Sequence, residues 1–236
     1  MNCLQTFRFK KFSVCQDGAA MKIGTDGVLL GAWSNCNNAL RILDIGTGTG
    51  VIALMMAQRF PNAEIEAVEI EEQASQTAQK NFINSPWKER LTVFCTPIQK
   101  YKPSYTYDLI VCNPPFFDEK VAAKGLARQT ARQTVFLDLA QIFGFASKYL
   151  SETGNLSIIF PKSKEKYLWK EAAKYKLFPS RITNIRGRSG LPEKRILVEL
   201  KKEKNEPVIT SLCIEKERHI YTESYINLVK DFYLKM

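Results

Sequence analysis

The segment from Arg41 to Glu69 constrains the fold of this chain more than any other. It reads as a short apolar strand, a loop with glycine at alternate positions, a helix and a second strand. Glycines let the backbone turn tightly and bring its N–H groups close to a ligand. Because a strand, a glycine loop and a helix form the first half of a nucleotide-binding βα unit, the segment predicts an α/β fold.

Strand and helix patterns alternate along the rest of the chain. Strands are predicted over residues 41–45, 64–69, 91–95, 107–112, 154–160, about 181–186 and 194–200. Helices are predicted over residues 50–59, 71–84, 135–150, 163–176 and about 222–235. A short turn at 187–191 predicts a final hairpin on an otherwise parallel sheet. The pattern therefore predicts a doubly wound, mostly parallel seven-stranded sheet that binds ligands at its carboxyl edge.

Two further features lie at that predicted edge. Glu69 ends the second strand, where a carboxylate can bind the ribose hydroxyls of an adenosine. Asn113, Pro114, Pro115 and Phe116 follow the strand 107–112. Prolines donate no N–H, so this backbone offers rigid carbonyl acceptors, the Asn113 amide adds another, and Phe116 offers a face for stacking. Such a motif is also common in turns, but its place after the glycine loop and Glu69 favours a site for a planar amino group.

These motifs and three further segments resemble the bacterial tRNA1(Val) adenine-37 N6-methyltransferases, a family of class I S-adenosylmethionine-dependent enzymes. The further segments are 7–12, 20–33 and 131–134, and the resemblance extends over nearly the whole chain. It implies a Rossmann-like methyltransferase domain over 1–236, with 39–236 as its core and 1–38 as an extension that covers the cofactor and RNA side. It also implies S-adenosylmethionine as cofactor, the anticodon stem-loop of a tRNA as substrate, and methylation of adenine N6.

The resemblance assigns roles to individual residues. The expected catalytic residues are Asn113, Pro114, Pro115 and Phe116. The expected cofactor-binding residues are Lys22, Thr25, Asp44, Gly46, Gly48, Gly50, Glu69, Gln99 and Asn113. Many relatives have an acid after the third strand that contacts the cofactor's adenine, whereas this chain has Pro97 there. We expect Gln99 or backbone groups to make that contact, or the contact to be missing.

Positive charge is concentrated in one part of the chain. Residues 162–204 carry 14 Lys and Arg against 5 Asp and Glu, in a chain of net charge +10. A lysine-rich face is often only solvated, but arginines around a turn favour a phosphate-binding patch. The loop 118–134 has further cations, at Lys120, Lys124 and two arginines, that would clamp phosphates from a lid. The expected RNA-binding residues are Arg8, Lys10, Lys11, Arg128, Arg132, Arg186, Arg188 and Arg195.

Other sequence features exclude some classes of protein. No apolar run reaches the roughly 18 residues that a membrane span needs, and the amino terminus does not resemble a signal peptide, so a cytoplasmic location is expected. The protein is also expected to be a monomer. The six cysteines are scattered and the chain has one histidine, so we expect free, buried thiols and no metal site.

Two alternative functions fit some of these motifs. The same chemistry could act on another planar amino group, either guanine N2 of ribosomal RNA or N5 of a protein glutamine. A nicotinamide-dependent dehydrogenase would also use a glycine loop and a ribose-binding acid. It leaves the motif at Asn113 unexplained, and the lone His219 is its only obvious proton-transfer residue.

Overall fold

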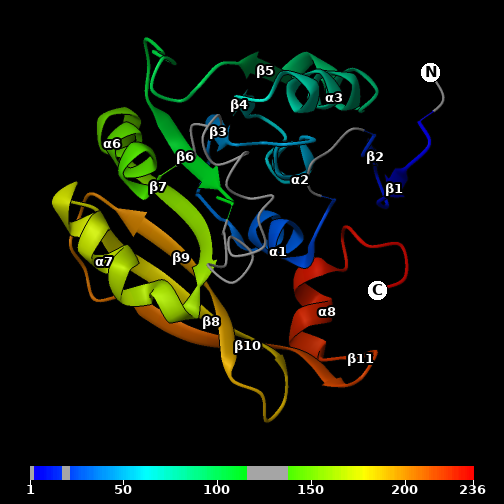
Figure 1. Cartoon of the computed structure of the whole chain (residues 1–236), viewed down its shortest axis with the longest axis vertical. Helices are drawn as coiled ribbons and strands as arrows, with labels where there is room; N and C mark the ends of the chain where they lie inside the picture. Colours follow the sequence, from blue (N-terminus) through cyan, green and yellow to red (C-terminus); the bar gives the residue numbers. More distant parts are fainter. Residues whose placement is uncertain (1–2, 18–21, 116–137) are drawn as a thin grey trace, which may run out of the picture.

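One mixed sheet forms the centre of the molecule (Figure 1). The computed structural model describes residues 3–17, 22–115 and 138–236, and within these the sheet has nine strands. In spatial order they are β11 (Ile220–Tyr221), β10 (Val208–Glu217), β8 (Phe178–Arg188), β9 (Glu193–Lys201), β7 (Leu150–Pro161), β6 (Tyr107–Cys112), β3 (Arg41–Ile45), β4 (Glu64–Glu69) and β5 (Leu91–Cys95).

The predicted fold class is confirmed, with one correction to the edge of the sheet. The strands β5, β4, β3, β6 and β7 are parallel, and β9 runs antiparallel between β7 and β8, as the predicted hairpin requires. The hairpin does not end the sheet, however. β10 pairs parallel with β8, and β11 pairs antiparallel with β10, so the sheet is wider than the predicted seven strands. The pattern of β10 was weak because most of its residues are exposed or half-buried.

Helices cover both faces of the sheet (Figure 1). The residues of α1, α2, α3 and α8 belong to one hydrophobic cluster, and those of α6 and α7 to the other. No helix in the described ranges is long and apolar enough to cross a membrane. The bounds are α1 Thr25–Trp33, α2 Val51–Arg59, α3 Glu72–Ile83, α6 Leu139–Tyr149, α7 Glu165–Lys174 and α8 Glu223–Val229, with 3₁₀ turns at Lys88–Arg90 and Lys162–Lys164.

Helix α1 was not predicted from its sequence. It has glycine at positions 27 and 31, which lowers helix propensity, and seven of its nine residues are buried, so it shows no polar face. Gly31 allows close packing on α2, because a Cβ at this position would lie 2.6 Å from Sδ of Met55. Tertiary packing therefore stabilises a helix that local signals do not indicate.

A buried carboxylate shapes the turn between β3 and α2. Oδ2 of Asp44 accepts hydrogen bonds from Oγ1 of Thr47 at 2.6 Å and from the N–H of Ala53 at 3.1 Å. Oδ1 is buried without a hydrogen-bond partner in the part of the chain that the structure describes. Burial raises the pKa of Asp44 from 3.8 to about 7, against the two hydrogen bonds, which lower it.

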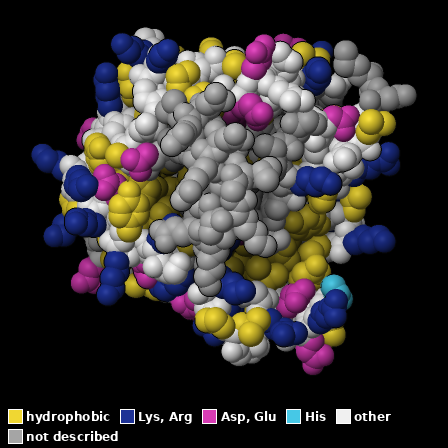
Figure 2. Space-filling view, in the orientation of Figure 1, with side chains coloured by type: hydrophobic (Ala, Val, Ile, Leu, Met, Phe, Trp, Pro, Cys, Tyr) yellow, Lys and Arg dark blue, Asp and Glu magenta, His cyan; other side chains and the backbone are white. Residues whose placement is uncertain are grey.

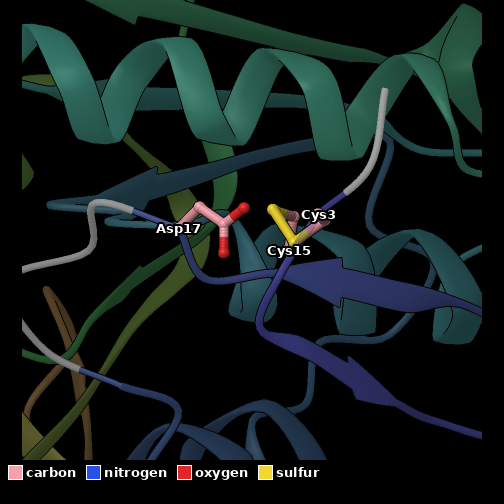
Figure 3. Close-up of side chains that lie close together, drawn as sticks. All are labelled: Cys3, Cys15 and Asp17. Atoms are coloured by element: carbon pink, nitrogen blue, oxygen red, sulfur yellow. A yellow bond between two sulfur atoms is a disulfide. The ribbon is translucent and has the colours of Figure 1, made fainter.

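An amino-terminal hairpin lies beside this core. β1 (Thr6–Arg8) pairs antiparallel with β2 (Ser13–Cys15), and Phe9, Phe12 and Val14 are buried in the cluster that contains α1 and α2. The expectation that all cysteines are free is wrong for two of them, because Cys3 and Cys15 form a disulfide (Figure 3). The hairpin brings their Cα atoms to 5.8 Å, within the range that a disulfide spans.

The same hairpin holds the one group of side chains in the described ranges that is close enough to bind a metal ion. It consists of Cys3, Cys15 and Asp17 (Figure 3). Its sulfur atoms are joined to each other, and the Asp17 carboxylate accepts hydrogen bonds from the N–H groups of Leu4 and Gln5, each at 2.9 Å. These contacts close the hairpin rather than leave its ligand atoms free.

The raised pKa of Asp44 predicts a pH-dependent stability. Below pH 4 the carboxyl is protonated in both folded and unfolded chains. Between about pH 4 and 7 it ionises only on unfolding, so the wild type loses stability as the pH rises. Relative to Asp44→Asn, this loss should reach up to about 4 kcal/mol, at about 1.4 kcal/mol per pKa unit. Urea unfolding of both proteins from pH 4.5 to 8 measures the difference, and a difference that is constant with pH would contradict the assignment.

The disulfide predicts the number of reactive thiols. Protein purified without reductant, unfolded and alkylated, should show modification only at the four free cysteines, Cys36, Cys95, Cys112 and Cys213. Reduction before alkylation should add Cys3 and Cys15. Peptide mass spectrometry distinguishes the sites. The Cys3→Ser variant is the control, since its Cys15 should react without reductant, whereas full labelling of the unreduced wild type would disprove the pairing.

Candidate active site

The glycine loop adopts a conformation that other residues rarely take. Gly46, Gly48 and Gly50 have φ values of 70°, 57° and 85°, all in the left-handed region. Gly50 precedes α2 and packs on α3, since a Cβ there would lie 2.5 Å from Cε1 of Phe82. Among the described residues, none would lie within 4 Å of a Cβ on Gly48. Gly50 is therefore required for packing, whereas Gly48 presents bare backbone to open space.

Glu69 lies against this loop. Its side chain is mostly buried, and its Oε2 accepts a hydrogen bond from the N–H of Gly48 at 2.8 Å. Its Oε1 accepts from the N–H groups of Ile70 at 2.8 Å and Glu71 at 3.0 Å. Since an ionised carboxylate has about four lone-pair sites, this orientation leaves capacity to accept from a ligand hydroxyl.

Asn113 is half-buried at the carboxyl end of β6, directly before buried Pro114 and half-buried Pro115. It faces the first turn of α1, because a Cβ on Gly27 would lie 3.8 Å from Nδ2 of Asn113. The same position would lie 3.7 Å from Val51, at the start of α2. Phe116 lies outside the described residues.

The parallel strands bring the glycine loop, Glu69 and Asn113 to one edge of the sheet. β3 lies between β4 and β6, so the residues that follow these three strands are neighbours. Beyond β5, the N–H of Thr96 donates to the carbonyl of Glu69 at 2.9 Å, which places the turn containing Pro97 beside the acid. Gln99 follows in this turn and is exposed, as are Lys22 and Thr25 before and at the start of α1.

One positioning residue was not predicted from the sequence. Asn81 is buried on α3, and its Nδ2 donates to the carbonyls of Thr49 at 2.8 Å and Cys15 at 3.0 Å. Its Oδ1 accepts from the N–H of Cys15 at 2.8 Å. Asn81 thus joins the glycine loop to the amino-terminal hairpin. The sequence does contain a signal for this role, because Asn81 is an amide on the apolar face of a helix, between Ala78 and Phe82.

The predicted RNA-binding residues differ in their surroundings. Arg186 pairs with Glu193 at 3.1 Å, and Nε of Arg195 pairs with Asp26 at 2.8 Å. Nζ of Lys10 donates to the carbonyl of Lys230 at 2.5 Å. These three cations are engaged within the protein. Of the others, Arg8, Lys11 and Arg188 are exposed, and Arg128 and Arg132 lie outside the described residues together with the rest of the proposed lid.

Comparisons with known proteins identify the chain as a methyltransferase. Residues 23–170 match the family model described as "Methyltransferase small domain". The fold is similar to that of a predicted O-methyltransferase from Agrobacterium tumefaciens, with a TM-score of 0.67 and 20% identity over 88% of this chain and 96% of that one. It is also similar to an O-methyltransferase from Brevibacillus brevis in complex with S-adenosyl-L-homocysteine, with a TM-score of 0.52 and 15% identity over 74% of this chain and 70% of that one. At these identities, the likeness shows the fold alone.

Proteins with similar sequences show to which methyltransferase family the chain belongs. A tRNA1(Val) (adenine(37)-N6)-methyltransferase from Flavobacterium psychrophilum is 45% identical over 98% of this chain and 100% of its own length. A protein of the same name from Christiangramia forsetii is 45% identical over 98% of this chain and 99% of its own length. The similarity therefore includes the amino-terminal hairpin and the carboxyl-terminal strands as well as the methyltransferase core. The resemblance seen in the motifs is confirmed, and the chain belongs to the tRNA1(Val) (adenine(37)-N6)-methyltransferase family.

Proposed function

We propose that this protein methylates the N6 amino group of adenine 37 in the anticodon loop of tRNA1(Val), with S-adenosylmethionine as methyl donor. The observation that carries this proposal is 45% identity over 98% of the chain to relatives with that name. The arrangement of the glycine loop, Glu69 and Asn113 at one edge of the sheet supports it.

The residues at this edge fit the proposed cofactor. Gly48 offers bare backbone facing open space, and the Glu69 carboxylate beside it retains acceptor capacity for a ribose hydroxyl. Asp44 holds the turn that carries the glycines, and Gln99 follows the strand beyond Glu69. When bound, S-adenosylmethionine supplies an electrophilic methyl group on a sulfonium. The protein's task is therefore to hold the cofactor and to orient the nucleophile.

Asn113 and Pro114 are proposed to orient the adenine amino group. The lone pair of N6 is delocalised into the adenine ring, which makes this nitrogen a poor nucleophile. If the side-chain oxygen of Asn113 and the carbonyl of Pro114 accept the two amino hydrogens, the nitrogen can move toward tetrahedral geometry as it attacks. Pro114 is buried, and Pro115 after it restricts its ψ, so its carbonyl is held in place. Positioning and electrostatics then carry the catalysis.

An adenine in an anticodon loop suits this arrangement. Loop bases are unpaired and can be extruded at lower cost than bases in a duplex. The exposed cations Arg8, Lys11 and Arg188 would contact the phosphates around it.

The reaction can be tested on RNA directly. The protein should transfer one methyl group to unmodified tRNA1(Val), and nucleoside mass spectrometry should detect N6-methyladenosine that fragment mapping places at position 37. Substitution of adenine 37 by guanosine should abolish transfer. N2-methylguanosine as the product, or methylation of a protein glutamine instead of RNA, would overturn the proposal in favour of another amino-group substrate.

The role of Asn113 predicts a loss of rate without loss of cofactor affinity. Asn113→Ala should lower the single-turnover rate at saturating RNA by about 10²–10³-fold, by analogy with removal of one oxyanion-hole donor. S-adenosylhomocysteine binding, measured by calorimetry, should change by less than about threefold. Because Asn113 contacts α1, a thermal melt of the variant serves as control for folding. A rate within about threefold of wild type would exclude the acceptor role.

The proposed role of Glu69 predicts a loss of cofactor affinity. Glu69→Ala should weaken S-adenosylhomocysteine binding by about 10–150-fold, since hydrogen bonds to charged groups contribute about 1.5–3 kcal/mol. Glu71→Ala is the matched control. It removes the same charge two residues away, where the side chain is exposed and makes no capping hydrogen bond. Equal affinities of the two variants in calorimetry would remove Glu69 from the cofactor site.

A further inference from the structure

A groove of about 1000 Å³ lies between segments from both ends of the chain. It is bordered by β1, the start of α1, the turn between β8 and β9, and the carboxyl-terminal segment that contains β11 and α8. Figure 2 shows hydrophobic side chains gathered beside the end of the molecule that carries the single histidine, with Lys and Arg side chains near them.

Two segments far apart in the sequence contact each other at this groove, which Phe7 and Tyr233 both line. The N–H of Lys10 donates to the carbonyl of Phe232 at 2.8 Å, and Phe9 forms an isolated bridge with Tyr233. The Tyr233 ring stacks on that of Phe9, with centroids 6.0 Å apart, and meets the edge of the Phe7 ring at 6.2 Å. Backbone and ring contacts therefore preorganise this surface.

The groove combines cations with aromatic rings. Arg8, Arg188, Arg218 and Lys235 line it and are exposed. In the part of the chain that the structure describes, no ion pair involves Arg188, Arg218 or Lys235. Tyr221 and Tyr233 also line the groove and are half-buried. Cations for phosphates beside rings for bases are the features by which proteins bind single-stranded nucleic acid.

The groove also adjoins the candidate active site. Gly24 and Thr25 line the groove at the start of α1, and Gly27 lies against Asn113. At a helical rise of about 1.5 Å per residue, these positions are less than one turn apart. An RNA strand in the groove would therefore lie next to a base held at Asn113.

We propose that this groove binds the unpaired nucleotides next to the target adenine. Arg188, Arg218 and Lys235 contact their phosphates, and the exposed part of the Tyr221 ring stacks on a base. The choice of RNA as the occupant rests on the proposed function. It is favoured over a protein partner because four exposed cations line the groove against one half-buried acid, Glu215. The groove extends the expected RNA surface to the carboxyl-terminal segment that contains β11 and α8.

A charge-matched comparison tests the phosphate contacts. The triple variant Arg188→Ala, Arg218→Ala, Lys235→Ala should weaken binding of a labelled tRNA1(Val) anticodon stem-loop at least tenfold in fluorescence anisotropy. The slope of log K against log salt should fall in magnitude by about 2, at about 0.7 per phosphate for single strands. The control Lys164→Ala, Lys166→Ala, Lys170→Ala removes the same charge from exposed positions on and before α7, and should leave the slope unchanged. Equal slopes for the two variants would overturn the proposal.

Tyr221 tests the stacking contact. Tyr221→Ala should weaken stem-loop binding about 5–150-fold, the range for loss of one base–ring stack, whereas Tyr221→Phe should bind within about twofold of wild type. Equal weakening by Ala and Phe would exclude stacking.

The groove and the proposed function can fail separately. If the wild type methylates the stem-loop while the groove variants bind it with wild-type affinity and salt slope, the groove is wrong and the function stands. If the wild type binds the stem-loop through the groove but transfers no methyl group to it, the function is wrong and the groove stands.

Discussion

The hydrogen bonds accepted by the Glu69 carboxylate are the constraint on which the rest of the site depends. They join the end of β4 to the backbone of Gly48 and to the first residues after the strand. Gly48 makes this contact with its φ in the left-handed region, at 57°. The acid, the loop and the helix that follows are therefore one unit, with its shape fixed by backbone geometry as much as by side chains.

Asn81 extends this unit beyond the Rossmann-like core. It binds the carbonyl of Thr49 in the loop and both backbone groups of Cys15 in the hairpin. An amide can do this because it has two donors and an acceptor on one short side chain. The amino-terminal hairpin is thus tied to the glycine loop, where the cofactor is proposed to bind. The boundary between extension and core at residue 38 stays a prediction.

The sequence predicted those features that are determined locally. The strands β3, β4, β5 and β6 have the predicted bounds, because short apolar runs between turn residues leave little choice. Helix α1 and strand β10 were missed since long-range contacts stabilise them, one through close packing on Met55 and the other through pairing with β8. The disulfide was missed for the same reason, as spacing alone cannot show that a hairpin brings Cys3 to Cys15. Proximity of Glu69 to the glycine loop was predictable, but the internal ion pairs of Arg186 and Arg195 were not.

The contact between the chain ends has a consequence for synthesis on the ribosome. Lys10 and its hydrogen-bond partner Lys230 are separated by 220 residues. At a synthesis rate of about 5–20 residues per second, the hairpin waits on the order of 10–40 s before its partners Phe232 and Tyr233, which follow α8, are made. Until then, the aromatic rings of Phe7 and Phe9 lack their partner Tyr233, and α1 lacks α8. The nascent chain therefore exposes the apolar surface of this hairpin until the later segment is made, and a chaperone that binds early would have most to protect there.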